Sequence, residues 1–318
     1  MTTSLPAAFA VRDSVSTISA GTGIEKSCAQ VSFPERSFLQ SGEICRRQFL
    51  KMERRGGKAR FYASLAGIFA KLRLYPLAMK CFFHSAEKNG MTADSLYDEN
   101  EVRFTYDDSL KIVQNGFLRG SPPDKSLPVE VQSFIGPFTR NDTTVRPVAY
   151  AVILHIKQPV TGRRKVFNRP AKVGHTFITL IVYNSDSTSI SRSFGFYPKK
   201  DHLFSATPIF PATKSVFKDD AEHEWDELVA RFVPGKKFER VLKVIQRYEG
   251  HRYNLNKNNC TDFGLSIDLE AGISISDTRG SWFLGRGNNP GSAGQSVIEG
   301  KVTNADTNDR SGLLILTP

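Results

Sequence analysis

The sequence is poor in cysteine and contains no long apolar run. Its 318 residues include four cysteines, which are too few and too scattered for a disulfide-stapled fold, and no CxxC pair indicates a zinc or redox site. The longest apolar stretches, such as residues 177–183, fall far short of the ~20 residues that a transmembrane helix needs, so we expect no membrane span. Residues 1–23 also lack the basic start and the continuous apolar segment that mark a secretory signal.

The signatures of several large function classes are missing as well. The chain has no Walker loop, no Rossmann glycine pattern and no GxSxG elbow. The strongest basic cluster, between residues 46 and 60, stands beside no RNA- or DNA-binding motif, so we interpret it as a solvated face and expect no nucleic-acid partner. His223 and Glu224 begin an HExxH-like run, but Glu227 stands where the second histidine is required. We therefore expect a solvated acidic helix face there, with no metal and no cofactor.

The overall composition is that of an ordinary globular protein. Hydrophobic residues make up 40% and charged residues 24% of the chain, which excludes wholly disordered and coiled-coil classes. Lys and Arg outnumber Asp and Glu by 43 to 32, a formal net charge of +11. Such an excess favours anionic surroundings, among them acidic glycans, anionic lipids and nucleic acids.

Patterns along the chain divide it into five segments. Residues 1–38 are rich in Ser, Thr, Ala and Gly without sustained periodicity. Apolar residues then recur at helical spacing from Glu43 to Leu72, in two runs, and Pro76 and Gly90 bound a third helix over 77–89. We expect a flexible leader over 1–38, a helical region over 39–92, a connector over 93–146, a catalytic domain over 147–300 and a tail over 301–318.

The catalytic segment combines strands with helices and predicts an α+β fold. Residues 146–156, 173–183 and 188–197 are rich in β-branched and aromatic residues, and the tetrapeptide 184–187 is a hairpin turn signal, so we expect an antiparallel sheet. The runs 219–232 and 236–248 indicate helices. A further helix is expected over 260–271, ending at Gly272, and the chain beyond Trp282 is expected to wind over the surface.

Cys260 has the sequence setting of a reactive thiol. It follows Asn258 and Asn259 at the first turn of the expected helix, where unpaired amides and the helix dipole lower a thiol pKa and can also receive an oxyanion. A thiol nucleophile needs a base within hydrogen-bond reach. His175, preceded by Gly174 at the start of an expected strand, is the candidate base. Cys81 lies among Met79, Phe82 and Phe83, and we interpret it as a core residue.

This combination resembles the circularly permuted papain-like families. The Gly-His pair in a strand, the following run 194–198 (Phe-Gly-Phe-Tyr-Pro) and the run 253–255 (Tyr-Asn-Leu) ahead of Asn259-Cys260 are similar to permuted NlpC-type hydrolases, lecithin:retinol acyltransferase-like proteins and PPPDE proteases. The run 70–82 and the tetrapeptide 289–292 (Asn-Pro-Gly-Ser) resemble uncharacterised Bacteroidetes proteins. The resemblance covers roughly residues 147–300.

The resemblance implies a permuted papain-like domain and cysteine-dependent acyl transfer. Cys260 would attack a carbonyl, His175 would move the proton, and the Cys260 amide would stabilise the oxyanion. The residue that orients the histidine has no clear counterpart, so a bare dyad remains open. The groups considered for the third or oxyanion role are Ser189, Ser191, Ser193, Tyr197, Asn259 and Tyr253.

We expect a thiol hydrolase of amide bonds, with a peptidoglycan peptidase or amidase as the first choice. The basic charge favours an anionic cell-envelope polymer or peptide as partner, and an envelope or secreted location over the cytoplasm. Two alternatives stay open. One is a catalytically silent binding or scaffold module that docks through the basic helices, and the other is an acyl hydrolase of lipids or protein modifiers with the same fold.

Overall fold

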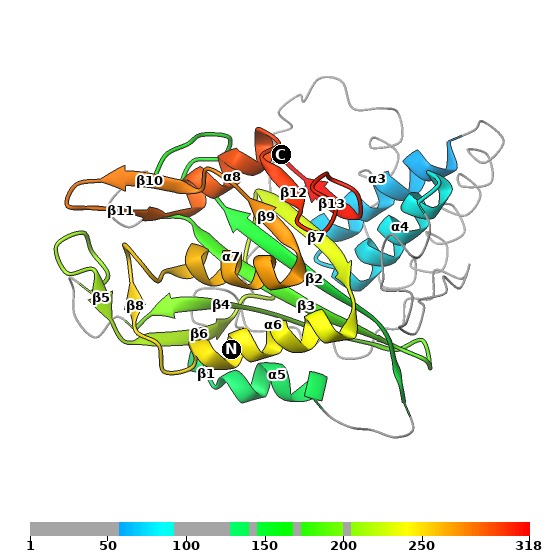
Figure 1. The fold of residues 1–318 in the computed structure, drawn as a ribbon, viewed down its shortest axis with the longest axis horizontal. Helices are drawn as coiled ribbons and strands as arrows, with labels where there is room; N and C mark the ends of the chain where they lie inside the picture. The colour runs from blue at the N-terminus through cyan, green and yellow to red at the C-terminus, as the bar shows by residue number, and fades with distance from the viewer. Residues whose placement is uncertain (1–56, 92–127, 140–144, 168–172, 200–204) are drawn as a thin grey trace, which may run out of the picture. The chain divides into compact units, whose positions relative to one another are not determined.

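A computed structural model gives the fold of the chain (Figure 1) and describes residues 57–91, 128–139, 145–167, 173–199 and 205–318. Residue contacts divide the chain after Gly56, and every described residue belongs to the unit 57–318. The expected leader over 1–38, the first run of the helical region, most of the connector, and Cys28 and Cys45 lie outside the described residues.

The described residues of this unit form a seven-stranded sheet in which every neighbouring pair is antiparallel. In spatial order the strands are β1 (Pro128–Val129), β6 (Ser215–Asp219), β4 (Ser189–Pro198), β3 (His175–Asn184), β2 (Pro147–Lys157), β7 (Glu227–Val233) and β13 (Leu313–Leu316). The long central strands β2, β3 and β4 coincide with the three runs expected from the sequence. The turn over 184–187 joins β3 to β4, with the Ser187 amide donating to the Asn184 carbonyl at 3.0 Å.

Helices pack on both faces of this sheet. One face carries α6 (Gly235–Tyr248), α7 (Cys260–Ala271) and α8 (Pro290–Ile298), and α6 and α7 lie in front of the strands in Figure 1. The other face carries α3 (Lys58–Lys71) and α4 (Tyr75–Lys88). There the Tyr183 hydroxyl donates to the Pro76 carbonyl at 2.8 Å, and the Phe83 ring meets the Phe232 ring edge-on at 5.8 Å. Because side chains alternate along a strand, β3 supplies apolar residues to both layers.

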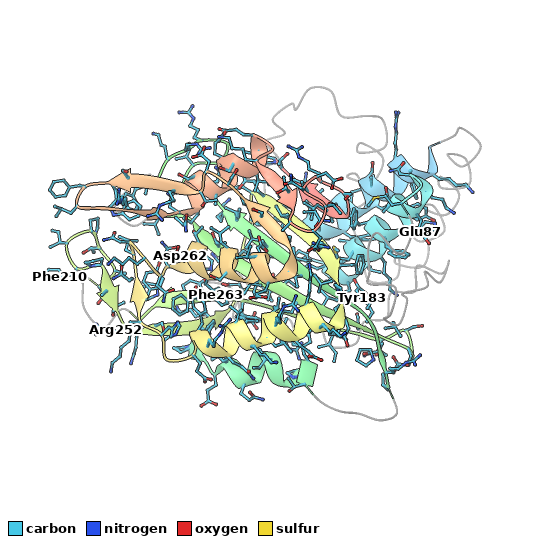
Figure 2. The ribbon with its side chains drawn as sticks, in the orientation of Figure 1. Glu87, Tyr183, Phe210, Arg252, Asp262 and Phe263 are labelled. Carbon is cyan, nitrogen blue, oxygen red and sulfur yellow. The ribbon has the colours of Figure 1, made fainter. Side chains whose placement is uncertain are left out.

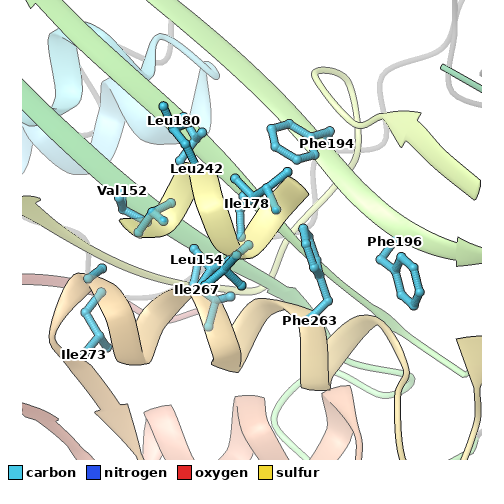
Figure 3. Close-up of a cluster of buried hydrophobic side chains, with 14 of the residues drawn as sticks. Val152, Leu154, Ile178, Leu180, Phe194, Phe196, Leu242, Phe263, Ile267 and Ile273 are labelled. Carbon is cyan, nitrogen blue, oxygen red and sulfur yellow. The ribbon is translucent and has the colours of Figure 1, made fainter. Parts of the chain in front are cut away.

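The core between the sheet and helices α6 and α7 fixes the position of α7. Figure 3 shows Phe263 and Ile267 of α7 pointing toward sheet residues such as Leu154 and Ile178, and all four side chains are fully buried. Burying a side chain of this size contributes roughly 1.5–3 kcal/mol. A Cβ at Gly264 would lie 2.7 Å from Leu154 and 2.8 Å from Thr176, so this glycine lets α7 approach the sheet closely.

The remaining elements include α5 (Val131–Thr139), which packs against β4 and α6, and several short strands. These strands are β5 (Ala212–Thr213), β8 (Tyr253–Asn254), β9 (Ile273–Ile275), β10 (Arg279–Trp282), β11 (Gly285–Asn288) and β12 (Val302–Asn304). Three small two-stranded sheets pair β10 with β11, β9 with β12, and β5 with β8. No helix among the described residues is long and apolar enough to cross a membrane.

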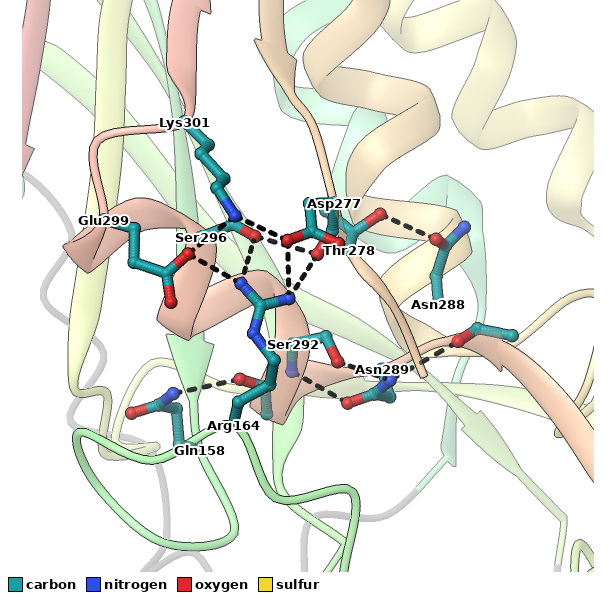
Figure 4. A network of polar contacts seen from close by, with 12 residues as sticks. Gln158, Arg164, Asp277, Thr278, Asn288, Asn289, Ser292, Ser296, Glu299 and Lys301 are labelled. Carbon is teal, nitrogen blue, oxygen red and sulfur yellow. Dashed lines mark hydrogen bonds and ion pairs between the residues drawn. The ribbon is translucent and has the colours of Figure 1, made fainter. Parts of the chain in front are cut away.

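A polar network attaches the loop after β2 to α8. Figure 4 shows Arg164 between the β9–β10 connection and the end of α8: it donates to the Asp277 carbonyl at 2.7 Å and pairs with Glu299 at 2.9 Å. Asn289 caps α8 by accepting from the Ser292 amide at 2.8 Å, and Pro290 occupies the first helical turn. The tetrapeptide 289–292 is thus a helix start that packs against this loop.

The mixed content and the large antiparallel sheet agree with the expected α+β class, and the helices expected at 77–89, 236–248 and 260–271 are confirmed. Three expectations are wrong. Residues 219–232 form no helix, because they end β6, turn, and enter the buried strand β7. The chain beyond Trp282 does not simply follow the surface, because α8 is buried against the sheet. Residues 301–318, expected as a tail, contribute β12 and β13.

Candidate active site

Asn259 sets the start of the helix that carries Cys260. Its backbone is extended, and its side-chain oxygen accepts from the amides of Thr261 at 2.8 Å and Asp262 at 3.2 Å. Asp262 completes a capping box by accepting from the Asn259 amide at 2.9 Å. The Asn-Cys pair therefore has a local physical reason: the asparagine ends the preceding loop and places the thiol on the first residue of α7.

The same cap narrows the choice of oxyanion donors. We expected several amides at the helix start to be available, but the side chain of Asn259 occupies those of Thr261 and Asp262. The Cys260 amide instead hydrogen bonds with the Tyr253 hydroxyl, which also contacts the thiol. The Tyr253 hydroxyl, the Thr176 amide and the Thr261 side chain therefore all interact with the thiol, and the Cys260 amide is itself engaged by Tyr253.

His175 is held by a buried carboxylate that the sequence did not reveal. It is the first residue of β3, and its Nε2 lies 3.1 Å from Oδ2 of Asp220, the residue directly after β6. The Tyr197 hydroxyl donates to Oδ1 of the same carboxylate at 2.5 Å, and the Tyr197 ring lies 4.2 Å from the imidazole. With Nε2 directed at Asp220, Nδ1 is the nitrogen left for the thiol.

Gly195 makes the histidine–carboxylate contact possible. It lies on β4, opposite Phe177, and a Cβ at this position would lie 2.5 Å from His175 Nε2 and closer still to Asp220. Only a residue without a side chain leaves room for the pair. A glycine is needed at position 174 for a different reason. Its φ of 72° is in the left-handed region, and a Cβ there would meet the Lys157 carbonyl and Pro159.

The thiol and the imidazole interact and shift each other's pKa. Burial raises the pKa of the Cys260 thiol, but the hydrogen bond and the charge of His175 outweigh it, aided by the Thr176 amide and the Thr261 side chain, so the pKa falls below its usual value. Burial lowers the pKa of His175, but Asp220 and Cys260 raise it to about 9. The two opposite shifts favour a thiolate beside an imidazolium.

The structure brings together some of the residues considered for the third role and excludes others. Tyr197, Tyr253 and Asn259 lie at the site as described. The Ser193 carbonyl accepts from the Asp220 amide at 3.1 Å, but the Ser193 hydroxyl lies 2.7 Å from that of Thr179 and makes no described contact with the imidazole. Two further candidates are farther along β4, where Ser191 pairs with Ile181 and Ser189 pairs with Tyr183.

Asp220 and His223 are the site residues that sequence reasoning missed. Both lie in the acidic run that was expected to be helical, and that expectation placed them on a solvated face. In the structure the His223 ring lies 5.0 Å from the His175 ring, and its Nδ1 contacts the Glu224 carbonyl at 2.8 Å. Burial and the charge of His175 lower the pKa of His223. The usable signal was the strand-like run Ser-Val-Phe-Lys that ends at Asp219.

A small pocket reaches the thiol from the loop side of α7. It has a volume of about 20 Å³, room for about one water molecule. Its lining includes the apolar side chains of Phe167, Leu255 and Trp282 together with Asn259 and Cys260. A larger cavity of about 300 Å³ lies elsewhere, between Lys71 and Thr317, and does not include the thiol. The candidate site is therefore identified by its thiol, imidazole and carboxylate and not by the size of its cavity.

In the described part of the chain, neither Cys81 nor any cluster of possible metal ligands forms a second candidate site. Cys81 is fully buried, and burial raises its pKa to about 12, as suits the expected core residue. Among the described residues, no group of three or more His, Cys, Asp or Glu side chains is arranged to hold a metal ion. Comparisons with protein-family models, with curated proteins and with solved structures find no match to this chain.

Proposed function

We propose that this protein is a cysteine-dependent hydrolase of amide bonds whose triad is Cys260, His175 and Asp220. The observation that carries the proposal is a helix-start thiol that interacts with a buried histidine, whose Nε2 is held by a buried carboxylate. A nucleophile, a base and a group that orients the base are the parts of covalent acyl transfer.

The reaction follows from the proton positions. The Cys260 thiolate attacks the substrate carbonyl carbon, and the carbonyl electron pair moves to oxygen. There the Tyr253 hydroxyl donates a hydrogen bond, and the Cys260 amide does so once the oxyanion replaces its contact with that hydroxyl. The His175 imidazolium gives its proton to the leaving nitrogen as the carbon–nitrogen bond breaks, leaving a thioester on Cys260. His175 then takes a proton from water, the resulting hydroxide attacks the thioester, and the acid product leaves as the thiolate is restored.

Asp220 acts on this cycle through the histidine. Its carboxylate fixes the ring and stabilises the imidazolium, while Tyr197 fixes the carboxylate. Burial and the Asp220 charge raise the pKa of Tyr197, so its hydroxyl keeps its proton and remains a donor. These contacts fix the orientation of the base relative to the helix that carries the nucleophile.

The chain order and the architecture support a permuted papain-like assignment as part of this proposal. The histidine strand precedes the cysteine helix, and that helix packs against an antiparallel sheet that includes the histidine strand. For the substrate we propose a peptide amide with a small residue on the acyl side, since the pocket beside Cys260 has little room. Alanine-containing peptidoglycan peptides meet this condition and suit a chain of net charge +11.

The test is turnover of a set of amide substrates with glycyl, alanyl and leucyl acyl groups, including peptidoglycan peptides. We expect hydrolysis of the small ones, and Cys260→Ala should abolish it while the melting temperature stays nearly unchanged. Cys81→Ala is the matched control, because it removes a thiol without touching the site. Hydrolysis that survives in Cys260→Ala would remove the assignment, and absence of any turnover or thiol reactivity would favour the scaffold alternative.

A further inference from the structure

Exposed apolar side chains lie on two segments close to the residues that line the thiol pocket. Phe283 and Leu284 form the turn of the β10–β11 hairpin and are 77% and 62% exposed. Ile209 and Phe210, in the loop before β5, are 62% and 59% exposed. Isolated exposed apolar residues are common on any protein, but two protruding pairs at one end form a patch that needs an explanation.

The segments that carry these side chains contact one another and the pocket. The Leu255 amide donates to the Pro211 carbonyl at 2.9 Å, which ties the loop before β5 to β8. Asn256 packs against the hairpin, where a Cβ at Gly287 would lie 2.6 Å from its carbonyl. Leu255 and Trp282 line the pocket that contains Cys260. We call residues 205–214, 251–258 and 279–286 together the rim.

The charge of the rim has one sign. Its three segments contain no Asp or Glu. They carry five exposed cations: Lys214, Arg252, Lys257, Arg279 and Arg286. Figure 2 shows Arg252 and Phe210 at the end of the unit where β5, β8 and the β10–β11 hairpin lie. Of the described carboxylates that flank the rim in sequence, Asp262 caps α7 and Asp277 pairs with Arg164 and Lys301, whereas Glu249 is exposed.

We propose that the rim docks the protein onto the surface of an anionic lipid bilayer. Protruding aromatic and aliphatic side chains enter the interface between headgroups and acyl chains, while Lys and Arg around them attract anionic headgroups. The exposed aliphatic side chains of Leu284 and Ile209 favour a bilayer over a polyanion such as RNA or an acidic glycan. An aliphatic side chain gains no binding free energy from contact with a solvated polyanion. Docking turns the pocket of Cys260 toward the membrane.

Vesicle binding tests the inference with the full chain. The protein is sedimented with phosphatidylcholine vesicles and with vesicles containing about a third phosphatidylglycerol. We expect binding to the anionic vesicles, and Phe283→Ser/Leu284→Ser should lower the partition coefficient by about tenfold or more, because two large apolar groups no longer leave water. The matched control is Leu72→Ser/Leu269→Ser, which alters two side chains that are 61% and 66% exposed outside the rim and should change nothing.

A second measurement locates the contact. In a Trp225→Phe background, Trp282 beside the hairpin turn is the one remaining tryptophan, and its emission should shift to shorter wavelength when anionic vesicles are added. Binding should persist in Cys260→Ala, so docking and the proposed chemistry can fail separately. The inference is overturned if the protein binds neither kind of vesicle, or if Phe283→Ser/Leu284→Ser binds as well as Leu72→Ser/Leu269→Ser. It is also overturned if binding depends on the anionic lipid but not on the apolar side chains of Phe283 and Leu284.

Discussion

Replacing Asp220 with Asn tests how the site activates its thiol. The carboxylate is the main reason that the pKa of the buried His175 rises from 6.5 to about 9 despite desolvation, a difference of about 3 kcal/mol. Without that charge, burial lowers the pKa of the imidazole, the imidazolium is lost at neutral pH, and the thiol pKa rises. We therefore expect the thiolate fraction of Cys260 near pH 7 to fall on the order of hundredfold.

The rate of iodoacetamide alkylation at Cys260, followed by mass spectrometry as a function of pH, measures this change. In the unaltered protein the rate should already be high below the usual thiol pKa. In Asp220→Asn it should be low near neutrality and converge with the unaltered protein only at alkaline pH. Asp219→Asn is the matched control, because this neighbouring carboxylate is exposed and makes no contact with the imidazole in the described contacts. An unchanged pH profile in Asp220→Asn would refute the reasoning.

Three further substitutions have defined outcomes. Gly195→Ala should abolish turnover, because its Cβ forces the paired histidine and carboxylate apart; Gly136→Ala, where a Cβ has room, should leave kcat unchanged. Tyr253→Phe should lower kcat by about a hundredfold if its hydroxyl donates to the oxyanion, whereas Tyr248→Phe, which loses a contact to a serine away from the thiol, should not. Burial raises the pKa of Glu227 from 4.5 to about 8, so the folded state binds this proton more tightly, and stability falls as pH rises from about 5 through 8. Denaturant titration should find Glu227→Gln more stable than the unaltered protein above pH 8, on the order of a few kcal/mol, and nearly equal to it at pH 4; equal pH dependence of the two would contradict this.

Periodicity along the chain predicted the elements that build the site. The strand of His175, the turn after Tyr183 and the helix from Cys260 to Gly272 each have local causes: β-branched alternation, turn residues, and an Asn cap followed by a glycine stop. The structure brings the two side chains together, and the Asn259 capping box explains why an Asn-Cys pair begins the helix.

Asp220 could not be predicted because its role depends on contacts that are distant in sequence. Acidic residues spaced along 219–232 match a helical pattern, but tertiary pairing of β7 between β2 and β13 overrides it. Gly195 was noted in its run, yet its function becomes visible only when the imidazole and the carboxylate meet above it. The sequence also overestimated the free amides of α7, since the Asn259 side chain that starts the helix occupies two of them.

The account's central claim is that Cys260 forms a covalent acyl intermediate with the help of His175. Brief incubation with an activated alanyl ester, an acid quench and peptide mass spectrometry measure this directly. We predict an acyl adduct on the peptide that contains Cys260, its loss in His175→Ala, and no adduct on the peptide that contains Cys81. An adduct spread equally over the four cysteines, or its persistence at full rate without His175, would contradict the claim.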